Sequence, residues 1–229
     1  LIALGAGALC GLWNGILVAF FDIQPIIATL ILMISGRGVA QMITEGQSPT
    51  FTNETLAFIG RGTIFGLPFP IYLAAAVLIL VTVVVRRTAI GMLIESVGIN
   101  ARASYYAGIN ARLIKLLVYI LSGVLAALAG LIVAGEVKSA DPHKAGEWAE
   151  LDAILAVVIG GTALTGGRFN LVQTTLGVLI IQSLLTALHV SKLHPTANLV
   201  VKAIVVLAVL LLQSEEFRHS MTRLVRRRS

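Results

Sequence analysis

The chain alternates between long apolar stretches and short polar segments, a pattern typical of a protein that crosses a membrane several times. Most of the stretches approach the roughly 20 residues that a helix needs to cross the hydrocarbon core of a bilayer. The predicted crossings are 1–21, 26–44, 67–85, 113–134, 171–189 and 199–213, with a further membrane element at 150–170. The predicted fold class is therefore all-α, a polytopic integral membrane helical bundle of about six to seven elements, one of them short or broken.

The element 150–170 differs from the other apolar stretches because it combines carboxylates with two glycine pairs. Glu150 and Asp152 open it, and Gly160-Gly161 and Gly166-Gly167 interrupt its apolar run. Glycine pairs allow the backbone to leave the helix or another helix to approach closely. Nonhelical backbone at membrane depth is tolerated only inside protein or along a cavity. We therefore predict a short or broken element; a tightly packed helix with an ordinary glycine turn is the alternative.

Composition supports the membrane class and excludes several others. The chain is 57% hydrophobic and 12% charged, whereas soluble domains carry about 25% charged residues. The net charge of +6 does not indicate nucleic-acid binding, because the basic residues lie between apolar segments. Cys10 is the single cysteine and lies in an apolar stretch, so no internal disulfide is expected. The chain starts at Leu1 inside an apolar run without a basic leader, so we expect it to be N-terminally incomplete.

Lysine and arginine positions predict which loops face the cytoplasm. The segments 86–115 and 214–229 each carry five basic residues, and cytoplasmic loops are enriched in such residues. Four predicted elements separate the two segments, an even number, so both can lie on one side. We predict one membrane domain, 1–213, with 86–112 cytoplasmic, followed by a basic cytoplasmic tail that contacts anionic lipid. The loops 45–66 and 135–149 are then external.

No motif in the chain indicates an enzyme. The phosphate-binding pattern Gly-x-x-x-x-Gly-Lys-Ser/Thr does not occur, so the chain is not expected to bind and hydrolyse ATP by itself. The four histidines are scattered and no cysteine cluster accompanies them, so no metal site is predicted. We expect neither a catalytic residue nor a bound cofactor.

A few polar residues interrupt the apolar stretches and are candidates for a transport pathway. Arg37 lies between two glycines, and it either faces a cavity or extends outward to the membrane interface. Asn14, Thr29 and Gln41 can bond a substrate hydroxyl, although hydrogen bonds between helices are the more usual role of such residues. The pair Asn14-Gly15 also interrupts the first predicted crossing. No carboxylate lies at mid-span in the first four crossings, which argues against an ion-coupled carrier.

The cytoplasmic segment 88–110 is too polar to cross the membrane and too apolar for a free linker. Gly98, Asn100 and Gly108 predict two short helices joined by turns. Such a pair either lies on the membrane surface or inserts into a groove on a partner. The glycines and the paired tyrosines at 105 and 106 favour the partner groove.

Several short motifs extend this picture, because they follow one another in a fixed order over most of the chain. They are Gly11-Leu-Trp-Asn14-Gly15, Ile23-Gln-Pro25, Arg37-Gly38, Thr44-x-Gly46, Gly98-x-Asn100-x-x-Ala103, Ala107-Gly108-Ile109, Glu150-Leu-Asp152, Gly160-Gly161-Thr162 and Gly166-Gly167. In this order they resemble the permease subunits of ribose-type carbohydrate ABC importers. The ending Gly-Gly-Arg-Phe-Asn at 166–170 is most similar to the galactofuranose permease branch, while many relatives carry glycine where Phe169 stands. The family's more N-terminal helices, with a Gly-x-Asp-Leu-Ser-type motif, are not part of this sequence.

The resemblance implies a non-catalytic permease subunit of an ATP-driven sugar importer in the bacterial inner membrane. Two permease chains form the pathway, and the galactofuranose-like ending favours two different chains. A cytoplasmic ABC ATPase that holds ATP and Mg²⁺ docks on the short helices, and a periplasmic sugar-binding protein docks outside, on 45–66 and 135–149. The expected substrate is galactofuranose or a related monosaccharide; a sugar channel or an ion-coupled secondary carrier is the alternative function.

The resemblance also implies roles for two groups of residues. The first group would line the substrate pathway and consists of Asn14, Thr29, Arg37, Gln41, Glu150, Asp152 and Thr162. The second group would contact the ATPase and consists of Glu95, Gly98, Asn100, Arg102, Tyr105 and Gly108.

Overall fold

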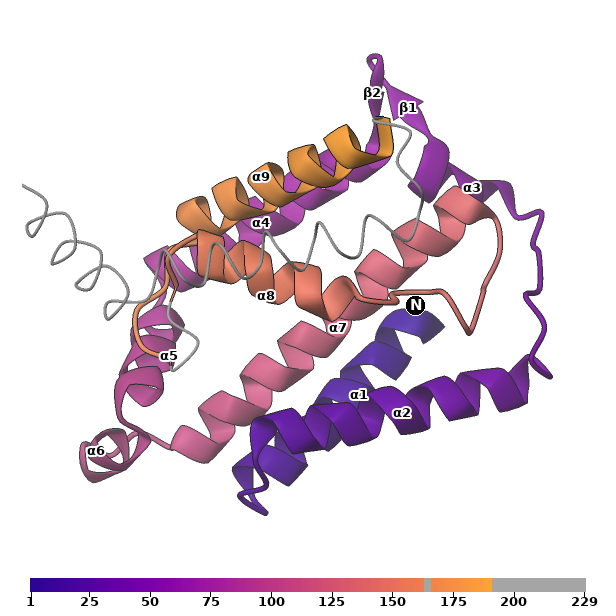
Figure 1. Cartoon of the computed structure of the whole chain (residues 1–229). Helices are drawn as coiled ribbons and strands as arrows, with labels where there is room; N and C mark the ends of the chain where they lie inside the picture. The colour runs from indigo at the N-terminus through magenta and orange to yellow at the C-terminus, as the bar shows by residue number, and fades with distance from the viewer. Residues whose placement is uncertain (163–165, 191–229) are drawn as a thin grey trace, which may run out of the picture. The chain divides into compact units, whose positions relative to one another are not determined.

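The computed structural model describes the backbone of residues 1–162 and 166–190, with side chains as far as 187 (Figure 1). The described chain forms two compact units, each with its own helix packing. The first unit is Leu1–Glu147 and the second begins at Trp148. The predicted crossing 199–213 and the basic tail 214–229 lie outside the described residues.

The first unit contains four apolar helices that are long enough to cross a membrane. They are α1 Ile2–Ala19, α2 Pro25–Ile43, α4 Phe69–Arg87 and α7 Ala111–Val137. Each corresponds to one of the first four predicted crossings, because apolar runs of this length dominate the sequence pattern. The proline at 25 occupies the first turn of α2, where its missing N–H costs no hydrogen bond. The prediction of a polytopic helical membrane protein is confirmed.

The most extensive helix packing in the first unit is between α1 and α7, which lie side by side (Figure 1). Gly7, Gly11 and Gly15 lie four residues apart, on the face of α1 that contacts α7. A Cβ atom at Gly11 would lie 2.8 Å from the Cα atom of Ile120, so only glycine lets the two backbones come this close. The predicted interruption at Asn14-Gly15 is wrong: α1 is continuous, because Gly15 packs against Leu116 instead of breaking the helix.

The loop 45–66 contains structure that the sequence pattern did not predict. Helix α3, Glu54–Arg61, is followed by a two-stranded antiparallel hairpin of β1, Thr63–Ile64, and β2, Leu67–Pro68. The Asn53 side chain begins α3 by accepting hydrogen bonds from the backbone N–H groups of Thr55 and Leu56. The predicted crossing 67–85 therefore starts two residues too early, since Leu67 and Pro68 belong to β2 and α4 begins at Phe69.

The two loops predicted to be external meet at one end of the first unit. Backbone hydrogen bonds join Phe51 N to Lys138 O at 3.2 Å and Ala140 N to Pro49 O at 3.0 Å. At the other end, Phe20 lines the same cavity as residues 108–113. The structure thus places the two loops predicted to be external at one end of the first unit and residues 108–113 at the other, as the predicted topology requires. Which end faces the cytoplasm stays a prediction.

The segment between α4 and α7 forms two short helices, as expected. Helix α5 is Ala89–Ile99 and α6 is Ala101–Tyr106. Asn100 separates them and begins α6 by accepting a hydrogen bond from Ala103 N at 3.0 Å. Gly108 turns the chain after α6 with φ +83°. The predicted turn at Gly98 is wrong, because Gly98 lies inside α5 and the helix ends one residue later.

The described residues of the second unit form a pair of packed helices, α8, Ala149–Ile159, and α9, Leu171–Val190. With 11 residues α8 is about 16 Å long, too short to cross a bilayer core. Its last turn leads into Gly160, where a Cβ atom would lie 2.7 Å from the Cα atom of Thr174 on α9. The predicted short element is confirmed. Gly160 also packs closely against α9, as expected from the alternative interpretation of a tightly packed helix.

Candidate functional site

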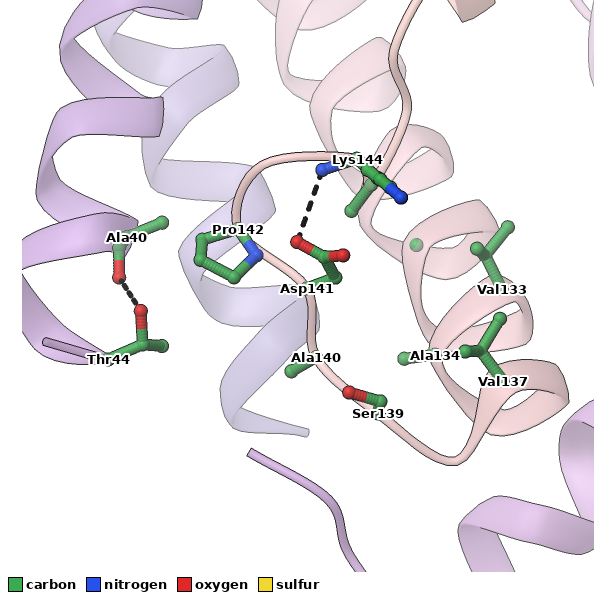
Figure 2. Close-up of a pocket in the computed structure, with 12 residues that line it drawn as sticks. Ala40, Thr44, Val133, Ala134, Val137, Ser139, Ala140, Asp141, Pro142 and Lys144 are labelled. Carbon is green, nitrogen blue, oxygen red and sulfur yellow. Dashed lines mark hydrogen bonds between the residues drawn. The ribbon is translucent and has the colours of Figure 1, made fainter. Parts of the chain in front are cut away.

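A cavity of about 440 Å³ lies where the C-terminal ends of α2 and α7 meet the loop after α7 (Figure 2). Ala40 and Thr44 line it from α2, Val133 and Val137 from α7, and Pro142 from the loop. The Thr44 hydroxyl donates to the Ala40 carbonyl at 2.9 Å, so its donor is already used. Ser139, Asp141 and Lys144 also line the cavity, but most of the lining surface is apolar. A sugar needs several convergent polar partners, and this cavity offers few.

The loop that covers the cavity is fixed to its surroundings by backbone and side-chain contacts. Lys138 ends α7 in the left-handed conformation, with φ 57°, which redirects the chain. Ser139 then pairs with Thr50 in an isolated antiparallel bridge. Asp141 Oδ1 accepts hydrogen bonds from His143 N at 2.8 Å and Lys144 N at 3.2 Å. The loop is thus an ordered wall of the cavity.

The same hydrogen bonds determine the charge state of Asp141. The backbone N–H of His143 stabilises the ionised carboxylate and lowers the pKa of Asp141 below its usual value; burial opposes this effect, and the backbone N–H of Lys144 adds to it. Asp141 is partly exposed to solvent, so this shift describes the local turn more than the stability of the fold. Asp141 is therefore a fixed negative charge at neutral pH.

His143 connects the loop to the end of α2. Its Nδ1 lies 3.2 Å from Nε2 of Gln41, and its Nε2 lies 3.3 Å from the Gly46 carbonyl oxygen. The carbonyl can only accept, so Nε2–H donates to it and Nδ1 accepts from the Gln41 amide. A neutral imidazole satisfies both contacts. Gln41, a predicted pathway residue, thus binds a histidine to which the sequence pattern assigned no role.

The other predicted pathway residues of the first unit are placed separately. Asn14 is buried on the α7-facing side of α1, and its Oδ1 has no hydrogen-bond partner among the described residues. The Thr29 hydroxyl donates to the Pro25 carbonyl at 3.0 Å, within its own helix. Thr29 lies 12 residues before Gln41, or about 18 Å along α2. These residues do not form one compact site in this unit.

Arg37 is half-buried on α2, between Gly36 and Gly38. A Cβ atom at either glycine would meet nothing within 4 Å, so this part of α2 is not packed closely against its neighbours. Residue 37 precedes the end of α2 at Ile43 by six residues, about 9 Å. A side chain as long as arginine can reach the interface over that distance. Both interpretations of Arg37 stay predictions.

The predicted ATPase-contact residues lie on and after α5 and α6. Glu95 is half-buried on α5, whereas Arg102 and Tyr105 are exposed on α6. Tyr105 and Gly108 line a second cavity, of about 790 Å³, between the end of α1 and the start of α7. The segment therefore presents polar and aromatic groups at one end of the first unit, beside an open cavity. Its contact with an ATPase stays a prediction.

In the second unit, the predicted residues lie at the two ends of α8. Glu150 and Asp152 are in its first turn, where negative charge interacts favourably with the helix dipole. Thr162 follows the last turn, and its hydroxyl has no hydrogen-bond partner in the described ranges. The apolar centre of the unit is formed by Leu155 and Ile181. The carboxylates and the threonine are therefore separated by the length of α8.

Two features of the first unit were not predicted from the sequence, for different reasons. His143 and Gln41 are 102 residues apart in the sequence, so their contact is not visible in any spacing. The four-residue spacing of Gly7, Gly11 and Gly15, in contrast, is a small-residue pattern typical of close helix contacts. That signal could have identified the α1 face that packs on α7.

Comparison with known proteins finds transport permeases that are similar to this chain over nearly its whole length. A family model described as the permease component of branched-chain amino acid transport systems matches residues 1–211. The galactofuranose transporter permease protein YtfT of Escherichia coli K12 is 56% identical over 217 residues, which cover 95% of this chain and 64% of that protein. No solved structure matches the chain.

Two further relatives are similar at lower identity. The fructose import permease protein FruF of Bifidobacterium longum is 40% identical over 100% of this chain and 65% of its own length. The ribose import permease protein RbsC of Escherichia coli K12 is 37% identical over 93% of this chain and 68% of its own length. The chain therefore spans about two thirds of the length of these relatives. With its long apolar helices, it is a multi-pass membrane protein that belongs to the family of branched-chain amino acid transport system permease components.

Proposed function

We propose that the chain is the membrane-spanning permease subunit of an ATP-driven sugar importer that depends on a sugar-binding protein. The 56% identity with a galactofuranose transporter permease over 95% of the chain carries this proposal. The fructose and ribose import permeases among the relatives support the wider class of monosaccharides. Galactofuranose or a related monosaccharide is the proposed substrate.

The proposal assigns different partners to the two ends of the first unit. The helix pair α5–α6 contacts a cytoplasmic ABC ATPase, which binds ATP and Mg²⁺ and carries out the hydrolysis. The exposed Tyr105 and Arg102, next to the cavity at residues 108–113, support this assignment. The external loops 45–66 and 135–149 face a periplasmic sugar-binding protein. The chain itself binds no nucleotide and acts in the bacterial inner membrane.

The mechanism requires two packed states of the helices that expose the pathway to opposite sides in turn. The closely packed α1–α7 pair would move as one body, because its glycine contacts leave no free space. A second, different permease chain would complete the pathway. The similarity of the 166–170 segment to the galactofuranose branch supports this heteromer.

The test is transport by the purified complex. The chain is affinity-purified from its native membrane with its partners, which are identified, and the complex is reconstituted into vesicles with the sugar-binding protein. Uptake of labelled galactofuranose, fructose and ribose is then compared in the presence of ATP–Mg²⁺, of a non-hydrolysable ATP analogue, or of an ion gradient alone.

We expect uptake only with ATP–Mg²⁺ and the sugar-binding protein. Uptake that persists on an ion gradient without ATP would instead indicate a secondary carrier, and uptake that equilibrates without either would indicate a channel. Recovery of the chain without an ATPase would contradict the proposed assembly.

A further inference from the structure

The tip of the β1–β2 hairpin carries an aromatic residue in an unusual backbone conformation. Phe65 and Gly66 form the two-residue turn, with φ of 51° and 82°. Turns in which both residues have positive φ normally use asparagine or aspartate followed by glycine, because bulky residues are strained there. Phe65 is nevertheless 97% exposed, so no packing within the described chain explains why a phenylalanine occupies this position.

The hairpin holds Phe65 in a defined place. The Tyr72 hydroxyl donates to the Ile64 carbonyl at 3.0 Å, and Phe69 N donates to the Gly62 carbonyl at 2.7 Å. The rings of Phe58 and Phe69 are in contact, with centroids 5.3 Å apart. These contacts attach the hairpin to α3 on one side and to α4 on the other. The exposed ring is therefore presented by a braced element.

The hairpin continues directly into a helix whose surface is available to lipid. Strand β2 ends at Pro68 and α4 begins at Phe69, with no residue between them. None of the residues of α4 is buried within the described structure, and the helix has the length and composition of a membrane crossing. Arg86 and Arg87 mark its opposite end. Phe69 is thus expected near the boundary of the hydrocarbon core.

The distance from that boundary to the hairpin tip matches the thickness of the headgroup layer. Two strand residues span about 7 Å. The headgroup and interfacial layer adds about 5–8 Å on each side of the hydrocarbon core. Leu67 and Ile71, which are each about half exposed, add apolar surface near the tip, and Thr63 on β1 is exposed as well. Amphipathic elements that bind at this depth use such apolar and aromatic side chains.

We propose that Phe65 and Leu67 anchor the hairpin in the phospholipid surface of the leaflet at the N-terminal end of α4. The surface that faces the sugar-binding protein is then the part of loop 45–66 before the hairpin, together with 135–149. The ring inserts at the boundary between headgroups and acyl chains and fixes the depth and rotation of α4. The anchor depends on α4 crossing the membrane and not on the identity of the transported sugar. It continues the lipid-contacting surface of α4 beyond the end of the helix.

The test measures the surroundings of residue 65 in the full chain, with the partners that purify with it, in phospholipid nanodiscs. Cys10→Ser removes the single native cysteine, and Phe65→Cys provides a site for an environment-sensitive fluorophore. Thr52→Cys is the matched control, because it is exposed in the same loop beside the end of α7. Quenching by phospholipid with a nitroxide just below the headgroup is compared with quenching by aqueous iodide.

We expect the fluorophore at 65 to be quenched by the lipid nitroxide and protected from iodide, and the fluorophore at 52 to show the opposite. The ratio of lipid quenching to iodide quenching should be several-fold higher at 65. Leu67→Cys repeats the measurement on β2 and should behave as 65 does. Iodide quenching at 65 equal to that at 52 overturns the proposal. Protection of 65 from both quenchers also overturns it, because a protein partner then covers the hairpin tip.

Discussion

The replacement Gly11→Ala tests whether close backbone contact holds α1 against α7. The added Cβ would lie 2.8 Å from Ile120 Cα, whereas ordinary van der Waals contact begins at 3.4 Å. The helices must therefore separate by at least about 0.6 Å, the difference of these two distances. The Tyr119 carbonyl is also too close to the new methyl group. Both obstacles are backbone atoms, so a change of side-chain rotamer cannot relieve them.

The expected loss of stability follows from the cost of overpacking. Inserting one extra carbon into a closely packed region costs about 1–3 kcal/mol. Alanine gains roughly 0.5–1 kcal/mol over glycine in a helix, which opposes part of that loss. Gly5→Ala provides this gain alone, since a Cβ atom at Gly5 meets nothing within 4 Å. The difference between the two variants therefore isolates the clash, at about 1–3 kcal/mol.

The assay is reversible unfolding of the purified chain in mixed micelles with increasing SDS, followed by circular dichroism and by tryptophan fluorescence. Coincident transitions are required before a free energy of unfolding is assigned. Gly11→Ala should unfold at lower SDS than wild type, and Gly5→Ala at the same or higher SDS. If the two variants unfold together, the α1–α7 contact does not hold the helices as the structure describes.

Three further predictions concern the candidate site. Arg37→Ala should lower sugar uptake per assembled complex more than it lowers the protein level; unchanged uptake would assign Arg37 to the membrane interface. Gly108→Trp combined with Arg102→Glu should leave the chain in the membrane but reduce the ATPase recovered on purification and abolish uptake. Removing the Arg102 charge costs about 3–5 kcal/mol of binding if the ATPase buries its ion pair, and about 0–1 kcal/mol if the pair stays exposed. Normal recovery of the ATPase with normal uptake would show that the segment is only a linker. The pKa of Asp141 is lowered, so the ionised carboxylate stabilises its turn fully above the usual aspartate pKa of about 3.9, and this stabilisation is lost as the pH falls through the folded-state pKa. A carbon-13 NMR titration of Asp141 should give a midpoint below about 3.9. A midpoint at or above about 3.9 would contradict the described hydrogen bonds.

The membrane helices of the first unit were predictable because one physical quantity defines them. The length of each apolar run matches the thickness of the bilayer core, so four helices were found within a few residues of their bounds. Pro25 and the caps Asn100 and Asn110 act within their own segments and are visible in the sequence. The short helix α8 was also predictable, because glycine pairs stop a helix locally.

The remaining features depend on partners that are distant along the chain. Helix α3 packs through Gly60 against Gly135 of α7, a backbone contact that no local pattern indicates. The continuity of α1 through Gly15 depends likewise on Leu116. In the candidate site, the Gln41–His143 contact unites two segments that composition alone would treat as unrelated. Sequence patterns describe each segment, whereas these contacts come from the way the segments fold together.

Helix α2 has a consequence that follows from the way its C-terminal end is held. Among its 19 residues only Ala28 is buried in the described structure, while Gln41 and the adjoining Gly46 hold its far end to His143. The segment that follows α2 is also joined to the loop after α7 by the backbone hydrogen bonds of Pro49 and Phe51. A displacement of the C-terminal end of α2 would thus reach the loop after α7 through the imidazole ring of His143 and through these backbone bonds. In this molecule one wall of the cavity and the end of a membrane helix are therefore expected to move together.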